Sequence, residues 1–280
     1  MRVINDTLEA EFALRKRHPE RETIYDDHQR RGAIVRSTGK CILDQRYGVG
    51  PRCLLDVFPA GAGAPVLFFI HGGYWRALDK SYVSFIAAPF RDAGFTVVMP
   101  GYDLVPSVRV GNIIDQMRAA LKWVVERLAP QRIIVAGHSA GGQLAAMLAL
   151  DQAVRGCGPI VGLAGISGVF DLRPLLRTSI NLDLALSSEE AARVSPLLRL
   201  KELPQDAALV PLLGIVGRDE TQGFRLWTAD FVAAWRRRGA PAQLFELAGR
   251  NHFTILDALA EPNGELVRSI CALRGGSGLI

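Results

Sequence analysis

The stretch 132–142, RIIVAGHSAGG, constrains the fold of this chain more than any other. Its β-branched run predicts a buried strand, and the Ala- and Leu-rich residues 143–150 predict a helix directly after it. Ser139 lies between them in the pattern Gly-x-Ser-x-Gly, where Gly137 and Gly141 lack the Cβ that would hold strand and helix apart. The stretch therefore predicts a sharp strand–turn–helix that presents Ser139 as a nucleophile beside a helix N-terminus. An ordinary glycine-rich turn is the structural alternative.

Strand and helix patterns alternate through most of the chain. Apolar runs of strand length lie at 66–70, 95–99, 160–166, 210–216 and 243–247, and helical patterns at 81–93, 113–128 and 222–238. The alternating stretches 42–47 and 52–58 instead predict an antiparallel pair at a sheet edge. Together they predict an α/β fold, with a mainly parallel, doubly wound sheet and an antiparallel N-terminal edge.

Residues 1–40 carry a weaker signal. Residues 5–17 have the apolar spacing of a short amphipathic helix, with Asp6 or Thr7 as its cap. Residues 18–40 are polar, and we expect them to be irregular. No functional role is assigned to this segment.

Residues 167–206 interrupt the strand–helix alternation. Pro174, Pro196 and Pro204 separate short helical pieces in this segment. We expect a small helical lid insertion over the carboxyl edge of the sheet. A surface excursion without substrate contact is the alternative.

Composition restricts the class of protein. A length of 280 residues with 49% apolar side chains suits one domain, 1–280. The formal charge of +5 comes from scattered basic residues, which argues against nucleic-acid binding. No run of ~18 apolar residues and no apolar signal core occurs, so we expect a cytoplasmic protein with no membrane partner. The four cysteines are widely spaced and predict reduced thiols rather than a metal site: Cys41, Cys53, Cys157 and Cys271.

Polar loops that follow predicted strands are the candidate catalytic elements, because sites in open α/β sheets form at the carboxyl ends of strands. A neutral serine hydroxyl needs a base within hydrogen-bond reach and a carboxylate that orients the base. His252, in the loop after the last strand, is the predicted base. His138 directly precedes Ser139 and should point away from it.

The acid is one of two adjacent residues, Asp219 and Glu220. Aspartate is the commoner and shorter triad acid, which favours Asp219. Spacing favours Glu220, which lies three residues after Gly217 at the end of a strand. Neighbouring residues in an extended chain point in opposite directions, so only one of them should face the histidine. We choose Glu220, with Asp219 as the alternative.

His71-Gly72-Gly73 follows the strand 66–70 and matches a known oxyanion-hole pattern. The N–H groups of Gly72 and Gly73, with that of Ala140, are predicted to face a developing oxyanion. One such donor is typically worth about 3 kcal/mol in the transition state. A Gly-Gly turn used only for packing is the alternative.

With these motifs placed, the chain resembles the arylformamidase (kynurenine formamidase) and carboxylesterase branch of the α/β-hydrolases. The resemblance covers roughly residues 44–270 and depends on four motifs: HGGYW at 71–75, GYDLVP at 101–106, GHSAG at 137–141 and NHF at 251–253. It implies an α/β-hydrolase fold and a triad of Ser139, Glu220 and His252. The family acid is often aspartate, so Glu220 is a departure. Pocket residues implied by the resemblance and the motifs are His71, Tyr74, Trp75 and His138.

The implied activity is hydrolysis of a small acyl group from an aryl amide, such as an N-formylkynurenine-type or N-acyl-aniline or anthranilate-type substrate, through an acyl-enzyme. A general carboxylesterase acting on short-chain esters is the alternative, and a non-catalytic binding scaffold is a more remote one. The expected partner is a small-molecule substrate, with no metal or organic cofactor. The sequence leaves the oligomeric state open, a homodimer included.

Overall fold

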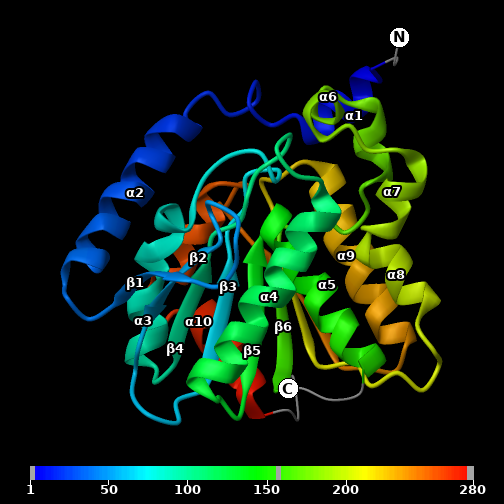
Figure 1. The fold of residues 1–280 in the computed structure, drawn as a ribbon. Coiled ribbons are helices and arrows are strands. Elements are labelled where there is room, and N and C mark those ends of the chain that lie inside the picture. Colours follow the sequence, from blue (N-terminus) through cyan, green and yellow to red (C-terminus); the bar gives the residue numbers. More distant parts are fainter. Residues whose placement is uncertain (1–3, 156–158, 276–280) are drawn as a thin grey trace.

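An eight-stranded sheet organises residues 4–155 and 159–275, the part of the chain that this computed structural model describes (Figure 1). The strands are β1 (Ile42–Arg46), β2 (Leu54–Phe58), β3 (Val66–Ile70), β4 (Thr96–Pro100), β5 (Ile133–His138), β6 (Ile160–Ile166), β7 (Leu212–Gly217) and β8 (Ala242–Leu247). They lie in the order β1-β2-β4-β3-β5-β6-β7-β8. β2 runs antiparallel to both β1 and β4, and the other neighbouring pairs are parallel. The predicted α/β-hydrolase fold with an antiparallel N-terminal edge is confirmed.

Helices cover both faces of the sheet. The helical segments are α1 (Asp6–Phe12), α2 (Arg21–Ser37), η1 (Lys80–Ile86), α3 (Ala87–Asp92), α4 (Val110–Leu128), α5 (Ala140–Arg155), η2 (Arg173–Arg177), α6 (Ile180–Leu184), α7 (Ser188–Arg193), α8 (Pro196–Glu202), α9 (Gln222–Arg237), η3 (Thr254–Leu259), α10 (Glu265–Ala272) and η4 (Leu273–Gly275). Phe68 and Val135 pack with α4, α5 and α9, whereas Leu67 and Ile134 pack with α3 and α10. The two cores form because successive strand side chains point to opposite faces. No helix in the described ranges is long and apolar enough to cross a membrane.

The segment 18–40, which we expected to be irregular, contains the helix α2, so that prediction was wrong. The apolar residues of α2 are sparse and show little helical periodicity. The position of this helix depends instead on tertiary contacts. Gly32 is buried so close to η1 that a Cβ there would lie 2.5 Å from the carbonyl oxygen of Ser81. The ring of His28 stacks on Phe85 with centroids 4.4 Å apart. These partners are distant in sequence, which explains why the local pattern did not predict the helix.

The helix α1 is shorter than predicted and has a different cap. It ends at Phe12 instead of continuing to residue 17. The side chain of Asn5, not of Asp6 or Thr7, caps it by accepting a 3.0 Å hydrogen bond from the N–H of Leu8. Figure 1 shows the chain running from α1 to α2 along the same end of the sheet as α6.

Residues 167–206 form η2, α6, α7 and α8, as short helical pieces. α8 packs against α5 and α9, while η2 contacts α1 and α7. Figure 1 shows α6 and α1 close together beyond the end of the sheet, where the predicted catalytic loops also lie. The segment therefore neighbours the candidate site from the side opposite to α2.

The turn between β5 and α5 has the close approach that its glycines predicted. Ser139 adopts a left-handed conformation with φ of 57°. A Cβ on Gly137 would lie 2.2 Å from the carbonyl oxygen of Gly141, and a Cβ on Gly141 would lie 2.1 Å from that of Ile70. Both neighbours are backbone atoms, one of α5 and one of β3, which cannot rotate away as a side chain can.

Gly141→Ala is therefore expected to destabilise the fold by more than about 3 kcal/mol, at the upper end of overpacking effects. Urea denaturation measures this change. Gly111→Ala is the matched control, because a Cβ there meets only the guanidinium of Arg193 at 3.6 Å. In a helix that replacement should be neutral or stabilising by up to about 1 kcal/mol. Equal stabilities for the two variants would contradict the close approach.

Candidate active site

Loops after β5, β7 and β8 bring Ser139, Glu220 and His252 into one hydrogen-bonded chain. The Ser139 Oγ lies 3.0 Å from Nε2 of His252, and Nδ1 of His252 lies 2.7 Å from Oε2 of Glu220. The three residues are only 3%, 6% and 4% exposed, respectively. Because a carboxylate only accepts hydrogen bonds, Nδ1 carries the proton and Nε2 is free to accept the serine proton. This arrangement can transfer a proton from the hydroxyl to the imidazole.

The structure separates the two candidate acids. Asp219 is exposed, and its backbone N–H donates to the carbonyl of Arg250 at 3.1 Å. Glu220 is buried, and its second carboxylate oxygen, Oε1, accepts from the N–H of Gly217 at 2.8 Å and from Oγ of Ser167 at 2.5 Å. The turn that follows β7 thus directs Glu220 inward and Asp219 to solvent.

Ser167 is a site residue that the sequence reasoning missed. It directly follows β6, has a left-handed backbone with φ of 48°, and is fully buried. Its hydroxyl donates to Glu220, so it orients the carboxylate that contacts the histidine. The available signal was its position after an apolar run, the same criterion that selected Ser139 and His252.

The N–H groups of Gly72, Gly73 and Ala140 are available next to Ser139. Within the described residues, none of these three groups donates a hydrogen bond. A Cβ on Gly72 would lie 3.1 Å from Cβ of Ser139, which places this loop directly against the hydroxyl-bearing residue. Gly73 has φ of 112°, a conformation that favours glycine. The three groups are candidates for oxyanion binding.

The four residues expected in the pocket divide into two pairs. Tyr74 and His138 line the cavity, and Tyr74 donates its hydroxyl hydrogen to the carbonyl of Phe12 at 2.9 Å. His138 does not point away from the site as expected, because its ring lies 4.7 Å from that of His252 and its Nε2 donates to the carbonyl of His252.

His71 and Trp75 are fully buried and lie behind the cavity wall, which corrects the expectation that they line the pocket. The His71 ring stacks on Tyr102 with centroids 4.3 Å apart. The indole N–H of Trp75 donates to the side chain of Gln143 at 3.1 Å. Tyr74 and Trp75 both have positive φ, and this turn directs the two adjacent aromatic rings to different sides of the loop.

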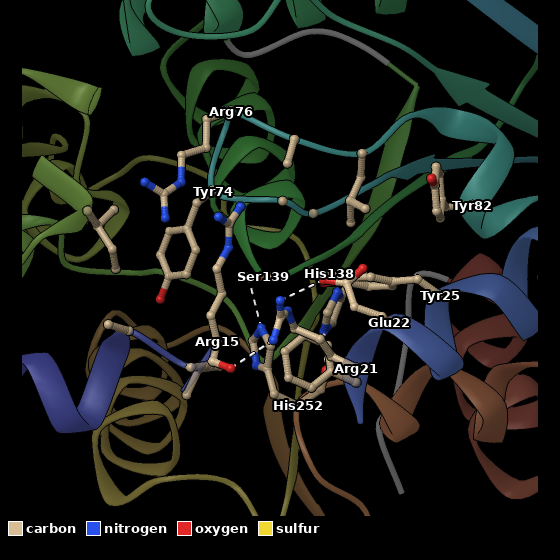
Figure 2. A pocket seen from close by; sticks show the side chains of 18 of the residues that line it. Arg15, Arg21, Glu22, Tyr25, Tyr74, Arg76, Tyr82, His138, Ser139 and His252 are labelled. Carbon is tan, nitrogen blue, oxygen red and sulfur yellow. Dashed lines mark hydrogen bonds and ion pairs between the residues drawn. The ribbon is translucent and has the colours of Figure 1, made fainter. Parts of the chain in front are cut away.

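A cavity of about 530 Å³ opens above Ser139 and His252 (Figure 2). A volume of this size suits a small organic ligand. Its lining includes the rings of Tyr25, Tyr74, Tyr82 and Phe253, and Tyr25 and Tyr82 were not predicted because one lies on α2 and the other on η1. Tyr25 contacts Tyr82 and Phe253 edge-on, with ring centroids 6.0 and 5.6 Å apart.

Metal-binding geometry is absent from the described ranges, where no three His, Cys, Asp or Glu side chains converge to hold an ion. Cys41, Cys53 and Cys271 are free thiols. Cys157 lies outside the described residues.

Burial keeps two imidazoles near the site neutral. Burial lowers the pKa of His71 to about 4, and burial, then the neighbouring His252, lowers the pKa of His138 well below 6.5. Each imidazole therefore binds a proton more readily in the unfolded chain, so their contribution to stability is complete above about pH 6.5 and decreases as the pH falls.

We expect the free energy of unfolding, measured in urea, to fall by roughly 1 kcal/mol per imidazole between about pH 6 and 5. His138→Gln should roughly halve this decrease, and an unchanged slope would contradict the assignment.

A model of the α/β hydrolase fold family matches residues 67–256. Kynurenine formamidase of Danio rerio is 29% identical over 249 residues, which cover 87% of this chain and 85% of that protein. Kynurenine formamidase of Drosophila melanogaster is 28% identical over 247 residues, covering 84% and 82%.

Solved structures have the same fold. A protein of Silicibacter sp., provisionally described as a thioesterase, is 30% identical with a TM-score of 0.75 and covers 90% of this chain and 91% of its own. The thermophilic carboxylesterase EstE1, from a metagenomic library, has the same TM-score at 21% identity and covers 92% and 97%. Taken with the sheet order and the turn at Ser139, these similarities show that the chain belongs to the α/β hydrolase fold family.

Proposed function

We propose that this chain is a serine hydrolase that removes a small acyl group from an aryl amide through an acyl-enzyme. The single observation that carries the proposal is the buried chain of hydrogen bonds from Ser139 through His252 to Glu220 at the base of the cavity. The N–H groups of Gly72 and Ala140 adjoin this chain and donate to no group in the described residues. They are therefore free to stabilise the negative charge that develops on the carbonyl oxygen of the substrate.

In the first half of the reaction, Oγ of Ser139 attacks the amide carbonyl carbon while its proton passes to Nε2 of His252. Glu220 stabilises the imidazolium that results, and the N–H groups of Gly72 and Ala140 stabilise the negative oxygen. The imidazolium then gives its proton to the departing amine nitrogen, the C–N bond breaks, and an ester remains on Ser139.

In the second half, His252 takes a proton from water, whose oxygen attacks the ester carbonyl. The tetrahedral intermediate collapses, Oγ of Ser139 recovers its proton from the imidazolium, and the carboxylic acid leaves. Each step uses the same three side chains, so no other group in the cavity has to exchange a proton.

Two features favour an aryl amide over other acyl substrates. The kynurenine formamidases of a fish and a fly align with most of this chain. The cavity is also lined by the rings of Tyr25, Tyr74 and Tyr82, which suit a planar aromatic group. Short-chain ester hydrolysis is the second candidate, favoured by the similarity in fold to a carboxylesterase.

The test compares an N-formyl aryl amine with p-nitrophenyl acetate at matched enzyme concentration. We expect the formamide to be hydrolysed with the higher kcat/KM, and a fluorophosphonate probe to label Ser139 in peptide mass mapping. Turnover of the ester alone would favour the esterase. Absence of both labelling and turnover would instead indicate a non-catalytic scaffold.

A further inference from the structure

The N-terminal segment forms one wall of the cavity, although the proposed reaction uses none of its residues. The N-terminal wall, defined here as residues 13–28, contributes charged and aromatic side chains from the loop after α1 and from the first part of α2. Figure 2 shows Arg15, Arg21, Glu22 and Tyr25 around the same opening as Ser139 and His252. This wall is therefore placed to select substrates by charge.

Four of the eight Asp, Glu, Lys and Arg side chains that line the cavity form two ion pairs with one another. Arg21 pairs with Glu22 at 2.6 Å and also donates to two backbone carbonyls of the wall. Arg76, on the opposite loop, pairs with Asp183 of α6. These two ion pairs contribute no net charge, so the selectivity of the cavity depends on the charged groups that remain.

The remaining acidic groups are poorly placed to bind a cation. Both carboxylate oxygens of Glu9 accept hydrogen bonds from Ser179, one from the N–H at 2.7 Å and one from the hydroxyl at 2.6 Å. Asp26 is exposed to solvent. The lining groups that form no ion pair in the described residues are thus two carboxylates, Glu9 and Asp26, and two cations, Arg15 and Lys16, and only the cations can bind an anion.

Arg15 is the cation best placed to contact a substrate. Within the described part of the chain its guanidinium forms no ion pair and donates no hydrogen bond. Its own backbone carbonyl accepts from Arg21 at 2.8 Å, which anchors the base of the side chain. Figure 2 shows the side chain extending from the N-terminal wall toward the end of the cavity where Tyr74 lies.

We propose that Arg15 is a specificity-determining residue that binds a carboxylate on the aryl part of the substrate. The inference rests on the proposed function and names its substrate class, N-acyl aryl amines that carry a carboxylate. A guanidinium stays charged at any relevant pH and presents paired N–H groups that match the two oxygens of a carboxylate. The tyrosines hold the ring while Arg15 holds the anion, and Lys16, which also lines the cavity, adds positive charge.

The experiment measures kcat/KM for the 2-, 3- and 4-formamidobenzoates and for the corresponding neutral formamidobenzamides. The wild type should prefer at least one carboxylate over its matched amide by about 10- to 100-fold, the size expected of a charge-assisted hydrogen bond. Arg15→Gln should remove most of this preference through a higher KM, with turnover of the neutral amides unchanged. Arg17→Gln is the matched control, because Arg17 is exposed and does not line the cavity.

Two results would overturn the inference: no preference for any carboxylate in the wild type, or an equal preference in wild type and Arg15→Gln. Calorimetric binding of the same benzoates separates this failure from that of the proposed function. Loss of affinity in Arg15→Gln without turnover in the wild type would support the carboxylate site and reject the hydrolytic function. Turnover with unchanged benzoate affinity would support hydrolysis and reject the role of Arg15.

Discussion

Ser139→Ala is expected to lower kcat by about 10⁵- to 10⁶-fold, because it removes the proposed nucleophile and leaves only binding and oxyanion stabilisation. Among the described residues, the Ser139 Oγ makes one hydrogen bond to a side chain, that with His252, so its loss should cost the fold little. Initial rates with an aryl formamide and with p-nitrophenyl acetate measure kcat, and thermal unfolding by circular dichroism measures stability.

Ser37→Ala is the control for this experiment, since Ser37 is an exposed residue at the end of α2. It should retain full activity. If Ser139→Ala kept more than about one hundredth of the wild-type kcat with both substrates, the covalent mechanism would be excluded. Loss of fluorophosphonate labelling in Ser139→Ala provides an independent readout that does not depend on the choice of substrate.

Glu220→Gln is expected to lower kcat by about 10³- to 10⁴-fold, the loss typical when the triad acid becomes an amide. The Glu220 carboxylate accepts from His252, Ser167 and the N–H of Gly217. An amide has one acceptor oxygen and cannot satisfy all three donors. If its NH₂ faces the histidine, Nδ1 must become the acceptor, and the imidazole proton moves to Nε2, which can then no longer accept the serine proton.

Asp219→Asn is the matched control, because this carboxylate is exposed and forms no hydrogen bond with His252 or Ser139. Its kcat should stay within about twofold of the wild type, as for surface changes away from a site. Initial rates with a saturating aryl formamide measure kcat for both variants. The reverse result, with Asp219→Asn inactive and Glu220→Gln active, would reject Glu220 as the triad acid and identify Asp219 instead.

The roles of two pairs of adjacent residues could not be distinguished from the sequence. Asp219 and Glu220 occupy one loop, and residue type and spacing favoured different answers. The tertiary structure separates them, because the N–H of Asp219 is held by the carbonyl of Arg250 from another loop. Tyr74 and Trp75 were likewise indistinguishable in sequence, yet one ring lines the cavity and the other contacts Gln143 in the core.

The sequence by itself determined the sheet, its antiparallel edge and the loops that carry Ser139 and His252, because these depend on local periodicity and on glycines at a sharp turn. The tertiary structure alone decided which acid faces the histidine, that Ser167 supports it, and that α2 forms part of the cavity wall. Those outcomes depend on contacts between residues far apart in the chain, such as Gly32 with Ser81 and Ser167 with Glu220. A local pattern carries no information about such partners, since their energy arises only once the strands and helices have packed together.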